Sequence, residues 1–394
     1  MKRVLFVDHA HRILGGAEIN IVELLGSALA KQRWAAACAC PRGSPLGEAL
    51  KEVGVPLWDY GFDSSLDQLR LVGRRFSFRA WLRGWAALRV ARKNLARIIA
   101  ESGSAVVVTC TNKDHFCAAA ACRRIGVPQV WWVNDIISAD FFPWPARAAF
   151  LWHARRGPAK LVTVSEFARI ALLRAGLAAS RVATIHNGIP LGRYQKTARG
   201  LLRQQWGLPD TELLVGIVGR FTPWKGQEFF LRLAQAWIQQ QAAGHFVLAG
   251  QAFNEEQAFE TGLRSFVAEQ GLGRRVHFAP FLADIAAALS DLDIVVHASL
   301  RPEPFGRVII EAMAVGAPVI AANDGGVPEI VEHGVNGLLA APGNLEAYLE
   351  QLHQLASSAQ LRSQLGGAGR QSVEARFTLE RVCEGFDRVF TGLA

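Results

Sequence analysis

Short apolar runs recur along this chain, each followed by a glycine-rich or polar turn and then by a stretch with helical periodicity. This alternation of strand with helix predicts parallel sheets with helices on both faces. The runs form two series, separated by a turn-rich segment at residues 186–200. We expect strands at Val4–Val7, Ala35–Ala39, Ala105–Thr109, Gln129–Val133 and Leu161–Val164 in the first series, and at Leu213–Val218, Phe246–Leu248, Val276–Phe278, Ile294–Val296, Pro318–Ala321 and Gly337–Leu339 in the second.

Two such series predict an α/β protein with two Rossmann-like, doubly wound domains that face each other across a cleft. The length of 394 residues agrees, because single cores stop growing at roughly 250–300 residues. We expect an N-terminal domain over residues 1–190, a second domain over 191–375, and a C-terminal helix over 376–394 that packs back towards the first domain. In such sheets ligands bind beyond the carboxyl ends of the strands, so the residues after each strand are the candidates for chemistry.

Charge is divided unevenly between the two halves. Residues 1–200 carry 29 Lys and Arg against 13 Asp and Glu, whereas residues 201–394 carry 14 against 21. A basic N-terminal half indicates an anionic partner there. The sequence has no apolar run of about 18 residues and turns polar at Asp8, so we expect a cytoplasmic protein.

The basic excess is concentrated in residues 70–97, which hold nine basic residues and no acidic one. As a helix, this segment would align Arg75, Arg79 and Arg83, with tryptophans and leucines on another side. Two interpretations are open: a helix lying in an anionic membrane interface, and a domain helix whose arginines are simply solvated. Nucleic acid is not expected, because no known binding module accompanies the charge.

Two glycines follow the first predicted strand. Gly15 and Gly16 precede a helix that begins near Ala17. Such a turn presents backbone N–H groups at the positive end of a helix dipole, which suits a phosphate group. The alternative is a tight strand-to-helix turn that binds nothing.

Two cations follow the first strand of the second series. The stretch VGIVGRFTPWKG places Arg220 and Lys225 just beyond that strand, with Gly219 beside them. Cations at this edge suit a diphosphate leaving group, since each charge pair is on the order of 4 kcal/mol at about 4 Å and an effective dielectric near 20. Solvated surface charge is the alternative.

Two glutamates mark the stretch RPEPFGRVIIEAMAVGAPVIA. Glu303 lies in a loop, Phe305 and Gly306 open a helix, and Glu311 lies further along it. One carboxylate can then receive sugar hydroxyls and the other ribose hydroxyls, with the helix N-terminus at the phosphates. The apolar residues around Glu311 place it near a buried surface, where a carboxylate without partners is costly.

The chain resembles the family 4 glycosyltransferases, which are retaining enzymes of the GT-B fold. The resemblance rests on GGAE, VTVSEFARIALLRAG, HNGIP, VGRFTPWKG, EPFGRVIIEAMAVGAPVIA and GGVPEIVEHGVNGLL, in that order over residues 4–343. It implies that Arg220 and Lys225 hold the donor diphosphate, that Glu303 holds the transferred sugar and that Glu311 holds the ribose. It further implies that the N–H groups of Phe305 and Gly306 meet sugar or phosphate, and that Gly16 approaches the diphosphate.

One departure from the family concerns a histidine that contacts the sugar. Family members commonly carry it after the strand that here reads QVWWV, where this chain has Asn134 and Asp135. Either of these residues is a candidate to substitute for it. His115, near the start of a predicted helix, is the other candidate, against its interpretation as a capping or surface residue.

The resemblance implies a mechanism without a protein nucleophile, in which the leaving phosphate takes the acceptor proton. We expect no required metal and no cofactor beyond the nucleotide-sugar substrate. The Asp291-Leu292-Asp293 sequence looks like a metal motif, but its place before a strand predicts a turn and a cap. The predicted function is sugar transfer to a glycan or lipid-linked acceptor in cell-surface polysaccharide, lipopolysaccharide or glycolipid synthesis. The alternative is a non-catalytic sugar-nucleotide-binding or scaffold subunit.

Overall fold

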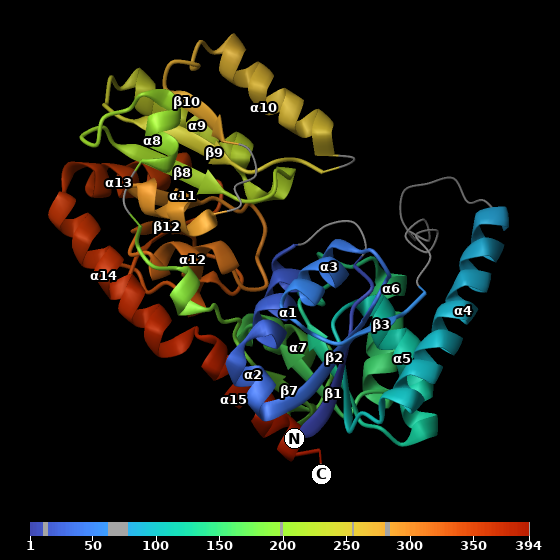
Figure 1. Cartoon of the computed structure of the whole chain (residues 1–394). Coiled ribbons are helices and arrows are strands. Elements are labelled where there is room, and N and C mark those ends of the chain that lie inside the picture. Colours follow the sequence, from blue (N-terminus) through green and yellow to red (C-terminus); the bar gives the residue numbers. More distant parts are fainter. Residues whose placement is uncertain (11–14, 62–77, 198–199, 254–255, 280–283, 394) are drawn as a thin grey trace. The chain divides into compact units, whose positions relative to one another are not determined.

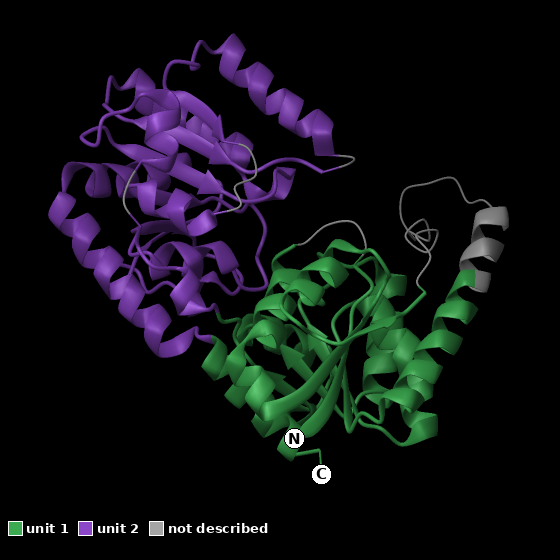
Figure 2. Ribbon diagram, in the orientation of Figure 1, with its two compact units in different colours: residues 1–188, 379–394 green, residues 189–378 purple. Residues whose placement is uncertain are grey.

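The computed structural model describes residues 1–10, 15–61, 78–197, 200–253, 256–279 and 284–393, and only the backbone of residues 78–86. The chain divides into two compact units (Figure 2). The first unit comprises Met1–Gly188 and Leu379–Ala394, and the second comprises Ile189–Thr378. Each unit has its own sheet and core and is described by itself.

The first unit is built on a parallel sheet in the order β3–β2–β1–β4–β5–β6–β7 (Figure 1). Every predicted strand is present, with ends within two residues of those expected. The apolar pattern did not predict β3 and β7, because a strand of three residues is too short to show alternation. The elements are β1 (Lys2–Val7), α1 (Gly16–Gly26), α2 (Ala28–Arg33), β2 (Trp34–Cys40), α3 (Pro45–Glu52), β3 (Leu57–Asp59), α4 (Phe78–Ser102), β4 (Val106–Thr109), α5 (Asn112–Ile125), β5 (Gln129–Val133), α6 (Trp144–Arg156), β6 (Lys160–Thr163), α7 (Glu166–Arg174), β7 (Val182–Thr184) and α15 (Leu379–Thr391).

Both faces of strand β1 are buried. Successive side chains of a strand point to opposite sides of the sheet, and those of β1 meet different helices on the two sides. Leu5 and Val7 pack in a cluster with residues of α4 and α5. Phe6 points to the other side, where its ring lies 6.3 Å from that of Phe386 in α15. Asp387 fixes α15 further by accepting hydrogen bonds from Arg33 and from the indole of Trp34. The last helix of the chain is therefore part of the first unit.

Helix α4 contains the C-terminal part of the basic segment. Its residues Ala91, Leu95 and Ile98 are buried in the core of the first unit, so this part is a domain helix. Residue Arg75 and the side chains of Arg79 and Arg83 lie outside the described residues, and the membrane interpretation stays a prediction. Among the described helices, none has the length and hydropathy that crossing a bilayer requires.

The second unit has a parallel sheet in the order β10–β9–β8–β11–β12–β13. All of its predicted strands are present, within one residue of the expected ends. The elements are α8 (Leu201–Trp206), β8 (Leu214–Val218), α9 (Gln227–Gln239), β9 (His245–Ala249), α10 (Gln257–Glu269), β10 (Val276–Ala279), α11 (Ile285–Asp291), β11 (Ile294–His297), α12 (Arg307–Ala314), β12 (Val319–Ala322), β13 (Leu338–Ala340), α13 (Leu345–Ser357) and α14 (Ala359–Arg376).

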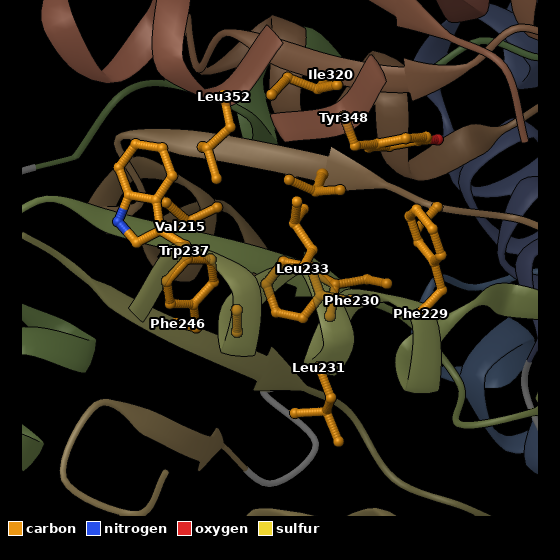
Figure 3. Close-up of a cluster of buried hydrophobic side chains, with 14 of the residues drawn as sticks. Val215, Phe229, Phe230, Leu231, Leu233, Trp237, Phe246, Ile320, Tyr348 and Leu352 are labelled. Carbon is orange, nitrogen blue, oxygen red and sulfur yellow. The ribbon is translucent and has the colours of Figure 1, made fainter. Parts of the chain in front are cut away.

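A large cluster of buried apolar side chains in the second unit joins strands of its sheet to the helices α9, α10 and α13 (Figure 3). Helix α9 contributes Phe230, Leu233 and Trp237, three positions on one face of a helix. Helix α13 contributes Tyr348, whose hydroxyl donates to the backbone oxygen of His297 at 3.0 Å. This bond ties the packed helix to the end of β11.

The sequence predicted a turn and a cap at Asp291-Leu292-Asp293, and in the structure both aspartates bind groups that are distant in the sequence. The Asp291 carboxylate accepts the backbone N–H groups of Gly200, Leu202 and Arg203 at the start of α8. Asp293 accepts from the Arg203 guanidinium at 2.7 Å and from the Leu214 N–H at 2.8 Å. Asp291 thus caps the start of α8, and Asp293 binds the buried Arg203.

Each sheet has one place where the strand order reverses. In the first unit this place is between β1 and β4: the strands β1 to β3 follow one another towards one edge of the sheet, and β4 to β7 towards the other. In the second unit it lies between β8 and β11. Parallel strands leave a crevice beyond their carboxyl ends at such a switch point, and ligands bind there. The loops after these four strands are therefore the places where chemistry is expected.

Candidate active site

Glu303 is the centre of a hydrogen-bonded cluster at the switch point of the second unit. Its Oε1 accepts from Lys225 Nζ at 2.6 Å and from His297 Nε2 at 2.8 Å, and it also accepts from the Ser299 hydroxyl. Lys225 comes from the loop after β8, and the other residues come from the end of β11 and the loop that follows. The two loops that flank the switch point thus meet at one carboxylate oxygen.

The environment of Glu303 keeps its carboxyl group ionised. The residue is 5% exposed, and this burial by itself raises its pKa. The charge of Lys225 and the contacts with His297 lower the pKa more strongly, so that it lies well below the usual range for a glutamate. At neutral pH the group is therefore a hydrogen-bond acceptor that sugar hydroxyls can meet.

Lys225 is positioned by the turn in which it lies. It ends a short 3-10 turn, Pro223–Lys225, and Gly226 follows with φ +79°. A Cβ atom at Gly226 would lie 2.0 Å from the carbonyl oxygen of Ala298, so only glycine fits this approach of the two loops. The ammonium group also lies 4.4 Å from the ring centre of Trp224.

Arg220 stands apart from the Glu303 cluster. Its side chain is 46% exposed, and its Nε lies 3.8 Å from Glu256 Oε2. Gly219, directly before it, has φ +145°, in the region that favours glycine. The two predicted cations therefore share an edge of the sheet, but Lys225 pairs with Glu303 whereas Arg220 lies near Glu256.

Glu311 belongs to a second set of hydrogen bonds. From α12 its Oε1 accepts from Arg307 Nε at 2.6 Å and from the Tyr194 hydroxyl at 3.0 Å. Arg307 also lies 3.2 Å from that hydroxyl. Glu311 is 9% exposed. Its hydrogen bonds with Arg307 and Tyr194 offset the free-energy cost of burying a carboxylate.

Phe305 and Gly306 lie directly before α12. Gly306 is the N-cap residue with φ +106° and, as a glycine, has no side chain with which to cap the helix. Phe305 is buried against Phe377, with ring centres 5.7 Å apart. The backbone oxygen of Glu303 accepts from the Gly326 N–H at 2.8 Å, which holds the loop before the helix against the loop after β12.

In the first unit, Gly15 is the N-cap of α1 and Gly16 its first residue. The Gly15 N–H donates to Glu18 Oε2 at 2.8 Å, so the carboxylate of the helix's own first turn occupies one of the amides predicted to meet phosphate. A phosphate would have to compete with Glu18 for that group.

The three candidates for the histidine position lie in different environments. Asp135 is exposed and accepts from Asn112 Nδ2 at 3.2 Å. Asn134 donates at 3.4 Å to the backbone oxygens of Cys110 and Trp132. His115 is 1% exposed, and its ring stacks on Trp131 at 4.5 Å.

The buried position of His115 suits packing rather than contact with a substrate. Burial lowers the pKa of its imidazole to about 3, so the ring is neutral at physiological pH. Thr109 is its hydrogen-bonding neighbour, with Oγ1 2.7 Å from Nδ1. We therefore place no sugar contact at this residue.

Two sequence profiles of glycosyltransferases match the chain. The profile described as Glycosyltransferase Family 4 matches residues 14–193, and the profile described as Glycosyl transferases group 1 matches residues 199–372. The chain belongs to glycosyltransferase family 4. The two matches fall on the first and second units respectively, so the family assignment extends over both sheets.

Curated relatives of this family 4 chain match over part of their length. Spore coat protein SA of Bacillus subtilis is 30% identical over 246 residues, which is 59% of this chain and 64% of the relative. The D-inositol 3-phosphate glycosyltransferase of Mycobacterium marinum is 31% identical over 192 residues, which is 48% of this chain and 39% of that enzyme. The chain thus spans less than two thirds of these relatives.

Solved structures match over the whole chain. HepE of Anabaena, in a crystal structure with UDP-glucose, is 26% identical with a TM-score of 0.83 and full coverage of both chains. Sucrose-phosphate synthase of Thermosynechococcus elongatus is 21% identical with a TM-score of 0.80, covering 100% of this chain and 99% of that one. These likenesses confirm the predicted GT-B fold.

Family 4 motifs in the sequence did not reveal several residues of the site. His297 and Ser299 join Lys225 at Glu303, and Tyr194 with Arg307 holds Glu311. Their position in the sequence could have indicated His297 and Ser299, since His297 ends a strand at the switch point and Ser299 follows it by two residues. Tyr194 carried no such signal.

A cavity of about 590 Å³ lies elsewhere in the second unit. Leu213, Asp293 and Pro318 line it, and each of them directly precedes a strand. The cavity is therefore at the amino-terminal edge of the sheet, opposite the edge that carries Lys225 and Glu303. In the part of the chain that is described, no group of three or more histidine, cysteine or carboxylate side chains is arranged to hold a metal ion.

Proposed function

We propose that this protein transfers a sugar from a nucleotide-sugar to an acceptor hydroxyl with retention of configuration. The observation that carries the proposal is the cluster of Lys225, His297 and Ser299 around Glu303 at the switch point of the second sheet. Membership of glycosyltransferase family 4 supports the same activity. That the reaction takes place in a cleft between two facing domains stays a prediction.

The second unit would bind the donor. Lys225 and Arg220 would meet the diphosphate, and the start of α12, whose N-cap is a glycine, would add its N–H groups and its dipole. Binding a diphosphate draws Lys225 from Glu303 towards the phosphates, which makes the Glu303 carboxylate available to sugar hydroxyls. Glu311, oriented by Arg307 and Tyr194, would receive the ribose hydroxyls.

In the transfer step, the acceptor oxygen would form a bond to the anomeric carbon while the bond from that carbon to the diphosphate breaks. The electron pair of the broken bond leaves with the nucleoside diphosphate, and the departing phosphate takes the acceptor proton. Lys225 and Arg220 would stabilise the charge that develops on the leaving group. No protein nucleophile and no metal ion are needed.

A UDP-sugar is the donor that we propose. The support is HepE, which was crystallised with UDP-glucose and is 26% identical over the full chain. The test combines a thermal-shift screen of nucleotide-sugars with an assay of nucleotide release. A UDP-sugar should raise the melting temperature and release UDP slowly in water, with or without a chelator. Binding without any turnover would favour the alternative of a non-catalytic sugar-nucleotide-binding or scaffold subunit.

For the acceptor we propose a glycan or lipid-linked glycan of cell-surface polysaccharide, lipopolysaccharide or glycolipid synthesis, met at the cytoplasmic face of the membrane. The basic excess of residues 70–97 supports this, since each Lys or Arg near an anionic surface contributes about 1 kcal/mol. Reversal of Arg75, Arg79 and Arg83 to glutamate should release the protein from anionic vesicles and leave donor hydrolysis unchanged. Unchanged sedimentation of the folded variant with vesicles would contradict the membrane proposal.

A further inference from the structure

The helices of the first unit cover its sheet in two layers. Val7, Thr109 and Trp131 are neighbours in register on adjacent parallel strands, so their side chains lie on one face of the sheet. On that face Val7 packs with residues of α4 and α5, and Trp131 packs with residues of α5, α6 and α7. Phe6 points to the other face, where α15 contacts α1 and α2, and α1 contacts α3. Figure 1 shows α4 and α5 on one side of this sheet and α2 and α15 on the other.

The two layers differ in charge. The side chains of α4 from Ala87 onward, together with those of α5, α6 and α7, include twelve lysines and arginines but three aspartates and glutamates. Helices α1, α2, α3 and α15 carry five basic and seven acidic residues. Within the basic layer the pKa of His153 in α6 is lowered, first by burial and then by the charges of Arg92 in α4 and Arg123 in α5. One face of the first unit thus attracts anions.

The outward side of α6 carries aromatic residues where solvated polar residues are usual. Trp144 is 80% exposed and Trp152 is 51% exposed. Ala148 is exposed between them, so the three residues form a line at positions i, i+4 and i+8. Phe150, on the inward side of the helix, is buried in the core. Arg156 lies over the Trp152 ring, 4.6 Å from its centre, and places a cation at the end of the line.

These two properties together fit the interface of an anionic bilayer. Tryptophan accumulates at the boundary between headgroups and hydrocarbon, because its large ring is apolar while its N–H group still finds a polar partner there. Lysine and arginine beside it meet the lipid phosphates. A soluble polyanion would satisfy the cations alone and leave Trp144 and Trp152 in water. The combination of charge and exposed tryptophan therefore favours a lipid surface.

We infer that the layer formed by α4, α5, α6 and α7 docks on an anionic lipid surface, with Trp144 and Trp152 among the headgroups and the surrounding cations at the lipid phosphates. Eight residues separate the two tryptophans, about 12 Å along a helix, so α6 would lie flat on the surface. The inference rests on the proposed function in one respect, since the lipid-linked acceptor is the reason to meet a membrane. The docking itself needs neither sugar transfer nor the arginines of residues 70–83.

Tryptophan fluorescence tests the contact directly. Vesicles of phosphatidylglycerol and phosphatidylcholine in equal parts, with bromine on the acyl chains, quench tryptophans that enter the bilayer. The double variant Trp144→Phe with Trp152→Phe keeps two apolar rings, so we expect it to bind these vesicles within about threefold of the wild type but to lose most of the quenching. Unchanged quenching would mean that other tryptophans, such as those of residues 70–97, enter the bilayer. That result would overturn the inference and leave the proposed function intact.

Sedimentation with the same vesicles tests the contribution of the tryptophans to binding. Trp144→Ser with Trp152→Ser should weaken binding at least about tenfold, because two exposed rings can no longer leave water. The matched control is Leu201→Ser with Val335→Ser, which removes two side chains of the second unit that are 46% and 51% exposed. The control should bind as the wild type does. Equal binding by the two double variants would overturn the inference.

A second pair of variants tests which layer faces the lipid. Arg123→Gln with Arg124→Gln, at the end of α5, should weaken binding at least about tenfold, since each cation near an anionic surface contributes roughly fivefold. Lys51→Gln with Arg388→Gln makes the same change of charge in the other layer and should have little effect. Equal losses would show a response to net charge alone and would overturn the inference. UDP release from UDP-glucose in solution should be unchanged in every variant; its absence from the wild type would count against the proposed function and not against the docking.

Discussion

Lys225 and Glu303 form an ion pair with 2.6 Å between Nζ and Oε1, although 78 positions separate them in the sequence. The side chains are 26% and 6% exposed, so the pair is largely withdrawn from water. The same lysine is proposed to meet the donor diphosphate. The pair thus holds Lys225 beside the donor site before the donor arrives.

Replacement of Lys225 by methionine should reduce turnover about a hundredfold or more, because the developing charge on the diphosphate loses a fixed cation. It should also lower the free energy of unfolding by about 1–3 kcal/mol, since Glu303 loses a charged partner. Adding Glu303→Gln should restore part of that stability but none of the activity. Urea unfolding and UDP-release kinetics test both statements, and wild-type turnover in Lys225→Met would refute the donor-site assignment.

Glu311→Gln and Glu303→Gln should change different quantities, the first the affinity for UDP and the second the rate of transfer. The ribose contact is present throughout the reaction, so Glu311→Gln should raise the Kd for UDP about tenfold with little change in kcat. Contacts with the transferred sugar change at the transition state, so Glu303→Gln should lower kcat. Tyr194→Phe should resemble a weaker Glu311→Gln, because it removes one bond that orients Glu311. UDP titration and initial rates separate these effects; equal losses of UDP affinity in both glutamate variants would count against the division of roles.

Gly226→Ala should damage both stability and activity. Its φ of +79° disfavours any side chain, and a Cβ atom would meet the Ala298 oxygen at 2.0 Å. We expect a loss of at least about 1–2 kcal/mol, together with reduced turnover as Lys225 is displaced. The control is Gly262 in α10, where a Cβ atom meets nothing within 4 Å. Gly262→Ala should leave turnover unchanged and stabilise the protein by about 0.5–1 kcal/mol. Thermal and urea unfolding give the comparison, and similar behaviour of the two variants would contradict it.

His115 should make the protein less stable in mild acid. The unfolded chain takes up a proton at the ordinary histidine pKa of 6.5, whereas the folded protein does so only near pH 3 because the ring is buried. The stability that results is fully present above pH 6.5 and is lost progressively as the pH falls from 6.5 to 3. Between pH 7 and pH 5 this group should cost the wild type about 2 kcal/mol. A His115→Phe variant, which keeps the stacking on Trp131, should lack that loss in urea unfolding at the two pH values. An exposed-site variant, His353→Gln, should keep it.

The order of elements could be predicted because strand and helix periods are local properties of the sequence. The predicted strands of the second unit agree with the structure to within a residue, whereas β3 and β7 are too short to leave a pattern. Parallel strands also fix which ends of the strands lie together. The sequence therefore predicted that Arg220, Lys225 and Glu303 lie at the same edge of the sheet.

The sequence by itself determined two parallel α/β units and the edge of each sheet at which chemistry is placed. Only the tertiary structure decided which side chains meet there: that Lys225 pairs with Glu303, that Tyr194 reaches Glu311 across 117 positions, and that His9 is held by Asp114 across 105. It also placed His115 in the core. The reason is physical: local periodicity fixes a residue's strand or helix, but a partner distant in sequence is chosen by how the loops at the sheet edge pack together.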